Sequence, residues 1–173
     1  VGGVGRVRME LHANSLAESL SRIYDGKFVP LHAPARVSSR NIRDELLKED
    51  SLLPAIYLTQ KLDIAVVGIG YPNEKSAIMA TGYFKENEIE SLIDRKVAGE
   101  LCMQFYDIYG DTAPYKDDNN VIGMDISMLR SVPRSIGIAG GVEKLRAVRG
   151  ALNGHYINTL ITDIECAEAL ISE

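Results

Sequence analysis

The sequence predicts an α/β fold built on a doubly wound, mostly parallel β-sheet. In the stretch 136–162, an apolar run, two glycines, a helical pattern that stops near Asn153 and Gly154, and a second apolar run form one βαβ unit. The run 62–69, LDIAVVGI, is almost wholly apolar, as is typical of a strand with helices on both faces. Strand and helix patterns also alternate along the chain, which favours a parallel sheet.

The composition is that of one soluble domain. The chain has 173 residues, and its 46% hydrophobic content is enough to fill a core. No apolar run approaches the roughly 20 residues needed to span a bilayer, so we expect no membrane partner and a cytoplasmic location. The net charge of −5, without a basic stripe, makes the chain by itself a poor binder of nucleic acid.

The cysteines and histidines form no metal-binding pattern. Cys102 and Cys166 lie far apart in apolar-periodic segments, so we expect two buried free thiols. The histidines, His12, His32 and His155, are isolated from one another along the chain. There is no Gly-x-Gly-x-x-Gly fingerprint with a downstream acid and no Walker lysine motif. The sequence therefore predicts neither a metal nor a cofactor.

The first half of the chain is expected to alternate helices with short strands. Helices are expected over residues 9–24, 40–48 and 52–60, and strands over residues 27–31 and 62–69. Pro54 is tolerated in the third helix because it falls in the first turn. Pro34 follows the first strand and ends it, because proline cannot continue a central ladder.

The second half adds a polar helix and a predicted antiparallel excursion. Besides the βαβ unit, helices are expected over residues 86–96, 127–130 and 163–172, and strands over residues 101–106 and 121–126. The last two strands are joined by a loop that is rich in turn residues, so we interpret them as an antiparallel pair. Asp163 is interpreted as the N-cap of the last helix, and Asp107 as a turn former.

Four loops that follow predicted strands are polar or rich in glycine. They cover residues 2–5, 32–34, 68–70 and 140–141. In an open α/β sheet, ligands bind beyond the carboxyl ends of the strands, so the convergence of these loops predicts a binding site for a small molecule.

Gly140, Gly141 and Lys144 point to an anionic ligand. Glycine at a strand-to-helix turn lets backbone N–H groups approach an anion, and the helix N-terminus adds partial positive charge. Lys144 in the first helical turn opposes the helix dipole unless an anion is bound there. These residues predict a phosphorylated or carboxylated ligand. The alternative is that the glycines form only a tight turn and that Lys144 is merely solvated; the spacing alone does not decide.

Glu100 and His12 are two further candidates. Glu100 lies between Gly99 and a predicted strand, where its carboxylate would accept hydrogen bonds from sugar hydroxyls; the alternative is an exposed carboxylate at the edge of the sheet. His12 lies on the first predicted helix, where a lone histidine is more often at the surface or hydrogen-bonded within the protein. No Ser-His-Asp or Cys-His arrangement can be assembled from the spacing.

Eight motifs follow one another along the chain: Gly2-Gly3-x-Gly5, His12-Ala13-Asn14, Leu31-His32-Ala33-Pro34-Ala35, Asp63-Ile64-Ala65-Val66-Val67-Gly68-Ile69-Gly70, Gly99-Glu100, Phe105-Tyr106-Asp107, Ala139-Gly140-Gly141-x-x-Lys144 and Ile161-Thr162-Asp163. In combination and order they resemble the effector-binding domain of SorC-type transcriptional regulators. The resemblance covers essentially the whole chain.

The resemblance implies a fold and a site. The fold is expected to be like that of sugar-phosphate isomerases and glucosamine-6-phosphate deaminase, without catalysis. The ligands of the family are sugars and phosphorylated sugars. Its effector contacts fall on His12, where the family often has glutamine, on Glu100 and on Lys144, and the residues Gly2 and Gly3 lie close to the family pocket. Residues 1–173 would be the C-terminal portion of the domain, without its helix-turn-helix and its first strand and phosphate loop.

The function implied by the resemblance is the sensing of a sugar or phosphorylated sugar that modulates DNA binding by the regulator of a carbohydrate operon. The expected partners are the effector, operator DNA through a helix-turn-helix outside this chain, and further copies in a homo-dimer or tetramer. The alternative is a sugar-phosphate isomerase or deaminase-like enzyme on the same fold, because fold alone does not fix function. Glu100 is the only residue that we would nominate as its base.

Overall fold

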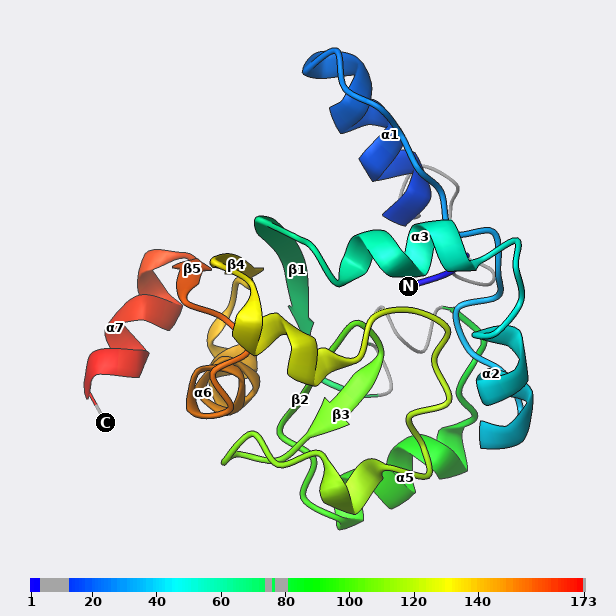
Figure 1. The fold of residues 1–173 in the computed structure, drawn as a ribbon. Coiled ribbons are helices and arrows are strands. Elements are labelled where there is room, and N and C mark those ends of the chain that lie inside the picture. Colours follow the sequence, from blue (N-terminus) through cyan, green and yellow to red (C-terminus); the bar gives the residue numbers. More distant parts are fainter. Residues whose placement is uncertain (4–12, 74–75, 77–80, 173) are drawn as a thin grey trace.

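The computed structural model describes residues 1–3, 13–73, 76 and 81–172, and these contain one five-stranded sheet in the order β3-β2-β1-β4-β5 (Figure 1). The strands are β1 (Ile64–Gly70), β2 (Gly99–Leu101), β3 (Gln104–Tyr106), β4 (Arg134–Ile138) and β5 (Thr159–Ile161). The α-helices are α1 (Ala13–Ile23), α2 (Arg40–Leu46), α3 (Leu53–Thr59), α5 (Glu86–Asp94), α6 (Leu145–Asn153) and α7 (Ile164–Ser172). Short 3-10 helices are η2 (Ala113–Tyr115), η3 (Ile126–Ser131) and η4 (Val142–Lys144). An α/β fold is confirmed.

The parallel half of the sheet consists of β1, β4 and β5. β1 pairs with β4 over five residues, and β4 pairs with β5 over three. The βαβ unit predicted for 136–162 is present as β4, η4, α6 and β5. α6 buries Ala147, Val148 and Ala151, which lie on one side of a helix of 3.6 residues per turn, so the apolar spacing explains why this helix packs on the sheet.

The antiparallel half differs from the prediction. Residues 101–106 do not form one strand, because the chain reverses at Cys102 and Met103, whose φ angles are 54° and 61°. Two successive positive φ angles are the geometry of a type I′ turn, which glycine or asparagine usually marks. β2 and β3 therefore pair with each other, and residues 121–126 form no strand beyond an isolated bridge between Val121 and Arg36.

The strand predicted over residues 27–31 is also absent. Its backbone makes no ladder with a neighbouring strand in the described structure; instead, the N–H and C=O of Leu31 bond to the side-chain amide of Asn14, each at 3.4 Å. The nearest ladder-like pairing is a single parallel bridge between Gly3 and Pro34. A β-propensity pattern without a paired neighbour stays an extended loop.

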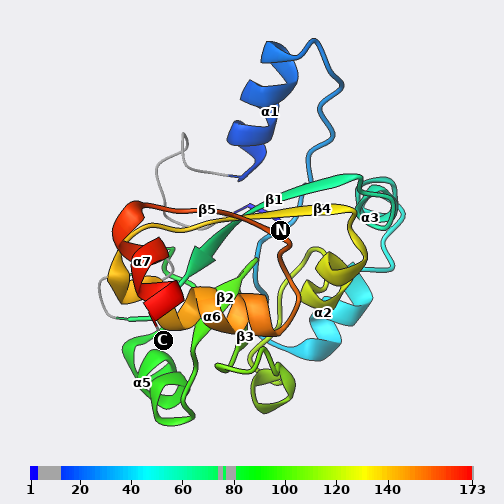
Figure 2. The same cartoon turned by 90° about the vertical axis from the view of Figure 1, so that its left-hand side faces the viewer.

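Helices cover one face of the parallel strands. Figure 2 shows α6 and α7 together on one side of β1, β4 and β5, whereas α1 projects from the other side. Ala65 and Ile69 are buried on the covered face, but Ile64 and Val66 are 54% and 59% exposed. Among the described residues, helices thus cover only one face of β1, so the doubly wound arrangement is incomplete. An apolar strand sequence shows that both faces can be buried, but not that they are.

The hairpin formed by β2 and β3 packs against α6. The Tyr106 hydroxyl donates to the carbonyl of Ala147 at 3.0 Å, and both residues are fully buried. Gly99 lies so close to α6 that an added Cβ would be 2.6 Å from the Cβ of Ala147. This tight packing fixes β2, and with it Glu100, relative to the start of α6.

Candidate functional site

The carboxyl ends of β1 and β4 lie side by side and define the candidate site. Gly68 of β1 is in register with Ile138 of β4, and each strand then leads into a glycine-containing loop, through Gly70 and Gly140 respectively. On the other side of β1, Gly70 pairs with Glu100 of β2. The sheet therefore brings Glu100 and the loop after β4 to one edge, which is where ligands bind in open α/β sheets.

The Glu100 carboxylate is held in place by Met103 and Gly70. Its Oε2 accepts a hydrogen bond from the backbone N–H of Met103 at 2.8 Å, which stabilises the turn between β2 and β3. Its Oε1 occupies the space beside Gly70, where an added Cβ would be only 1.9 Å away. Glu100 is therefore a partly buried carboxylate with a fixed direction, not the exposed edge carboxylate of the alternative reading.

The surroundings of Glu100 favour its protonated form. Burial raises the pKa of the Glu100 carboxyl to about 7, against the lowering effects of the Met103 N–H and of the Lys144 ammonium. α6 itself packs against β2, since Gly99 lies next to Ala147. A carboxyl group with a pKa near neutrality can accept hydrogen bonds from sugar hydroxyls when it is ionised and can also donate one when it is protonated.

We expect the stability of the free protein to fall as the pH rises through this window. The unfolded chain releases the Glu100 proton near pH 4.5, whereas the folded state keeps it up to about pH 7. The stabilising contribution is therefore complete below pH 4.5 and is lost as the pH approaches 7. The free energy of unfolding in urea, measured from pH 4.5 to 8, should show this decline, and Glu100→Gln should flatten it.

Glu90→Gln is the control for this measurement, because it removes a carboxylate from an exposed position on α5. The comparison cancels the contribution of other titrating groups. If Glu100→Gln and the unchanged protein have parallel pH profiles, the Glu100 carboxyl does not titrate in this window.

The loop after β4 is more acidic than the sequence indicates. The N–H of Gly141 donates to Asp163 Oδ2 at 2.5 Å, while the N–H of Cys166 donates to Asp163 Oδ1 at 2.8 Å. Both hydrogen bonds lower the pKa of Asp163 below its ordinary value, and the one from Cys166 has the larger effect. Asp163 thus caps α7, as predicted, but it also occupies a donor that was assigned to a ligand anion. The carboxylate of Glu143 also lies beside Gly141.

Gly140 and Lys144 are the remaining candidates for an anion at this loop. No partner of the Gly140 N–H is found among the described residues. Lys144 ends η4 and stands at the N-cap position of α6, so it directly precedes this helix instead of lying within its first turn. The Gly140 N–H and the Lys144 ammonium are therefore the donors left for an anion, because the Gly141 N–H is bonded to Asp163. The anion site stays a prediction.

Gly2 and Gly3 form backbone hydrogen bonds with other loops, and Gly3 bonds to the loop at 32–34. The N–H of Gly2 donates to the carbonyl of Ile122 at 2.9 Å, and that of Gly3 donates to the carbonyl of Ala33 at 2.6 Å. A Cβ at Gly2 would meet the Ala33 carbonyl oxygen at 2.3 Å, which explains the need for glycine. Both N–H groups are used within the protein, and His12 lies outside the described residues.

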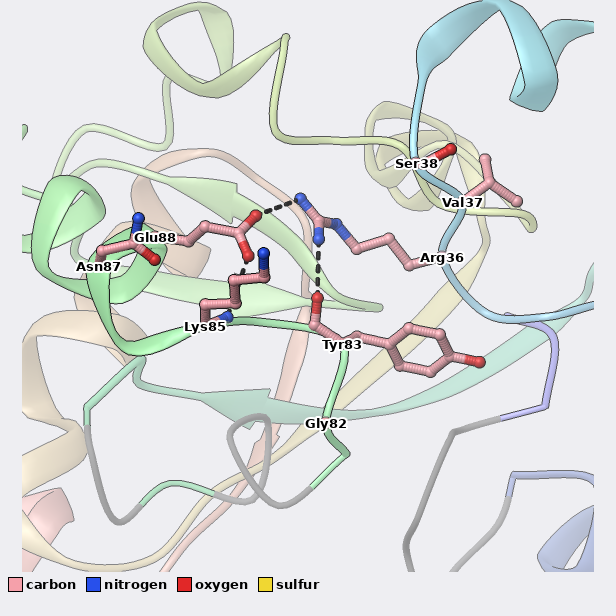
Figure 3. Close-up of a pocket in the computed structure, with 8 residues that line it drawn as sticks. All are labelled: Arg36, Val37, Ser38, Gly82, Tyr83, Lys85, Asn87 and Glu88. Atoms are coloured by element: carbon pink, nitrogen blue, oxygen red, sulfur yellow. Dashed lines mark hydrogen bonds and ion pairs between the residues drawn. The ribbon is translucent and has the colours of Figure 1, made fainter.

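A second hollow of about 460 Å³ lies away from this edge, beside α5. Figure 3 shows the Arg36 guanidinium reaching the carbonyl of Tyr83 and the carboxylate of Glu88, at 2.8 and 3.0 Å. The same guanidinium lies 4.3 Å from the centre of the Phe84 ring. Because Arg36 and Glu88 neutralise each other, we interpret this hollow as a structural junction between the segment after Pro34 and α5.

Sequence reasoning missed two features of the site. Gly70 makes room for the Glu100 carboxylate, and Asp163 reaches the turn at Gly141 from 22 residues away. Gly70 itself was a signal for the close packing of Glu100, since a glycine within an apolar strand often marks a place where another group approaches the backbone closely. Together, these observations define a domain of the open α/β class whose candidate site for a small molecule lies at the carboxyl edge of the sheet.

The chain belongs to the family described as "Putative sugar-binding domain", which matches residues 1–172. It is 31% identical over 170 residues to the sorbitol operon regulator of Klebsiella pneumoniae, covering 98% of this chain and 54% of the relative. It is 36% identical over 142 residues to the transcriptional regulator LsrR of Escherichia coli K12, covering 80% of this chain and 45% of the relative. The chain thus spans about half the length of these relatives.

Solved structures give the same result. The full-length sorbitol operon regulator SorC from Klebsiella pneumoniae superposes with a TM-score of 0.90 at 32% identity, covering 99% of this chain and 56% of that chain. A probable sor operon regulator from Shigella flexneri gives 0.87 at 31% identity, covering 99% and 66%. The resemblance to SorC-type regulators is confirmed, and the isomerase alternative finds no support in the names of these relatives. In the described residues, no helix is long and apolar enough to cross a membrane.

Proposed function

We propose that this chain is the effector-sensing domain of a transcriptional regulator and that it binds a sugar or a phosphorylated sugar at the carboxyl edge of its sheet. Two relatives are named as a sorbitol operon regulator and a deoxyribonucleoside regulator, which supports a carbohydrate effector. The observation that carries the proposal is the Glu100 carboxylate. It is partly buried, fixed by Gly70 and Met103, and influenced by the Lys144 ammonium.

In this proposal Glu100 binds sugar hydroxyls, and Lys144 contacts the anionic or carbonyl end of the effector. His12, Gly2, Gly3, Gly140 and Gly141 remain proposed neighbours of the ligand. Ligand binding biases the assembly of a homo-dimer or tetramer, and hence its affinity for operator DNA, because the effector binds one state better than the other. DNA contact is assigned to a helix-turn-helix outside residues 1–173, in the cytoplasm, and the fold is expected to be similar to that of sugar-phosphate isomerases.

A thermal-shift panel of sugars, sugar alcohols and their phosphates tests this function. A ligand present at about 100 times its Kd should stabilise the protein by about 2.7 kcal/mol, which is easily seen as a rise in Tm. The same compounds should pass unchanged through a turnover assay. A panel without any stabilising sugar, or isomerisation of a sugar phosphate, would contradict the proposal.

Lys144→Ala should separate charged from uncharged effectors. If the ammonium binds a phosphate, the variant should lose about 1.5 kcal/mol of affinity for the phosphorylated sugar and less for its unphosphorylated form. This difference should shrink as salt rises, because the ionic contribution is screened. Calorimetric titration at two salt concentrations measures it, with Lys116→Ala as a control that removes an exposed positive charge elsewhere. Equal, salt-independent losses for both ligands would assign Lys144 to another role.

A further inference from the structure

Asp163 bonds to two elements that meet at the candidate site. Its Oδ2 accepts from the N–H of Gly141 in the turn after β4, and its Oδ1 accepts from the N–H of Cys166 in the first turn of α7. A Cβ added to Gly140 would lie 2.8 Å from the same Oδ2. One carboxylate thus stands against both glycines of the turn and against the start of a helix.

The turn after β4 has few other restraints. The Ala139 N–H still donates to β5 at 3.1 Å, and the next bond, from the Lys144 N–H to the carbonyl of Gly141, already belongs to η4. Between them, Asp163 is the only acceptor found among the described residues for the N–H groups of Gly140 and Gly141. Because glycine has more backbone freedom to lose than any other residue, this turn would be held only at its two ends without the carboxylate.

The Asp163 carboxylate is itself anchored and ionised. Cys166 is fully buried in the core cluster that also contains Ala147 and Val148 of α6, so its N–H is a fixed donor. The hydrogen bonds from Cys166 and, to a smaller extent, from Gly141 lower the pKa of Asp163, so the side chain stays a charged acceptor at neutral pH. Capping of α7 alone does not require this second bond, because a serine hydroxyl caps a helix about as well as a carboxylate does.

We propose that Asp163 is a positioning residue of the effector site: it holds the turn at Gly140 and Gly141, so that the Gly140 N–H and the start of η4, which carries Lys144, keep a fixed geometry toward the effector. This inference rests on the proposed function, because it takes the loop after β4 as part of the effector site. Asp163 touches no ligand atom in this role; it lowers the cost of ordering the turn on binding. It does so against its own charge, since a carboxylate near the site repels an anionic effector.

Two variants separate this role from capping. In Asp163→Ser, the hydroxyl can still accept from the Cys166 N–H, but the shorter side chain does not reach Gly141. Asp163→Ala removes both bonds. In the free protein, the Gly141 amide should exchange with solvent at least roughly tenfold faster in both variants, whereas the Cys166 amide should do so only in Asp163→Ala. Asp125→Ser is the matched control, because it removes the same charge from the residue that caps η3.

Calorimetric titration then uses the compound of the sugar panel that stabilises the protein most. Asp163→Ser should bind it roughly tenfold more weakly than the unchanged protein does, at a nearly unchanged Tm, because the two glycines must now be ordered on binding. Asp125→Ser should bind it as the unchanged protein does. Equal affinity of Asp163→Ser and the unchanged protein would reduce Asp163 to a helix cap and overturn the proposal. Tighter binding would also overturn it, since the residue would then act only through its charge.

The outcomes distinguish this inference from the proposed function. A panel without any stabilising sugar contradicts the proposed function, and with it the site on which Asp163 acts. A stabilising sugar whose affinity is the same for Asp163→Ser contradicts only the positioning role. Unchanged exchange of the Gly141 amide in Asp163→Ser would contradict that role as well, already in the free protein.

Discussion

Above pH 7, where most of the Glu100 carboxyl is ionised, replacing Glu100 by alanine should weaken effector binding by about 1.5–3 kcal/mol, roughly 10- to 150-fold in Kd, the range for hydrogen bonds to a charged group. Gly70 and the turn at Met103 fix the position of this carboxylate, so little ordering is needed when it binds a ligand. The free protein should lose only about 1 kcal/mol near pH 6, from the unpaired N–H of Met103. Above pH 7 this loss should shrink, since the variant no longer buries a charge.

Isothermal titration with an effector identified in the sugar panel measures the change in Kd. Glu100→Gln is the informative companion, because its side-chain oxygen still accepts from the Met103 N–H while the charge is gone. It should keep the stability of the turn and lose part of the affinity. Glu90→Ala on the exposed face of α5 controls for net charge. An unchanged Kd for Glu100→Ala would remove this residue from the site.

Gly70→Ala should weaken binding to a similar extent, about 1.5–3 kcal/mol, without touching the ligand itself. The three atoms nearest to an added Cβ are Oε1, Cδ and Cγ of Glu100, at 1.9, 2.7 and 2.9 Å. Because these atoms belong to a flexible side chain, the strand should survive while the carboxylate swings away. The expected result is a folded protein with a displaced Glu100 and a large loss of affinity.

Gly68→Ala is the matched control, since it lies in the same strand and an added Cβ there would meet no atom within 4 Å. It should leave affinity unchanged and be neutral or slightly stabilising, because alanine has less freedom to lose than glycine. In a double-mutant cycle, Gly70→Ala should have no further effect once Glu100 is alanine. Full additivity of the two losses would show that Gly70 acts on binding by another route.

The two corrections to the predicted strands have a common cause. The patterns over residues 27–31 and 121–126 have the composition of strands, but a strand exists only where a second backbone pairs with it. The turn at Cys102 and Met103 could not be predicted either. Its positive φ angles occur at residues that rarely adopt them. Glu100, which directly precedes the turn, accepts from the Met103 N–H with a carboxylate that lies beside Gly70, 30 positions away.

The sequence by itself determined what depends on neighbours along the chain. The apolar periodicity of α6, the cap formed by Asp163 and the turn formed by Asp107 each rest on residues a few positions apart, so they were predicted correctly. The strand β1 was also predicted, but among the described residues only one of its faces is buried. The motifs in their order also identified the family, because the whole chain carries them.

Only the tertiary structure decided what depends on distant residues. The close approach of the Glu100 carboxyl to Gly70 and the occupation of the Gly141 N–H by Asp163 involve residues 30 and 22 positions apart, and burial is what raises the pKa of the Glu100 carboxyl. Desolvation depends on every group that excludes water from a site, and a hydrogen bond depends on where both partners lie in space. Neither the desolvation nor the hydrogen bonding can be predicted from the spacing of residues, so only the folded structure gives the electrostatics of the site.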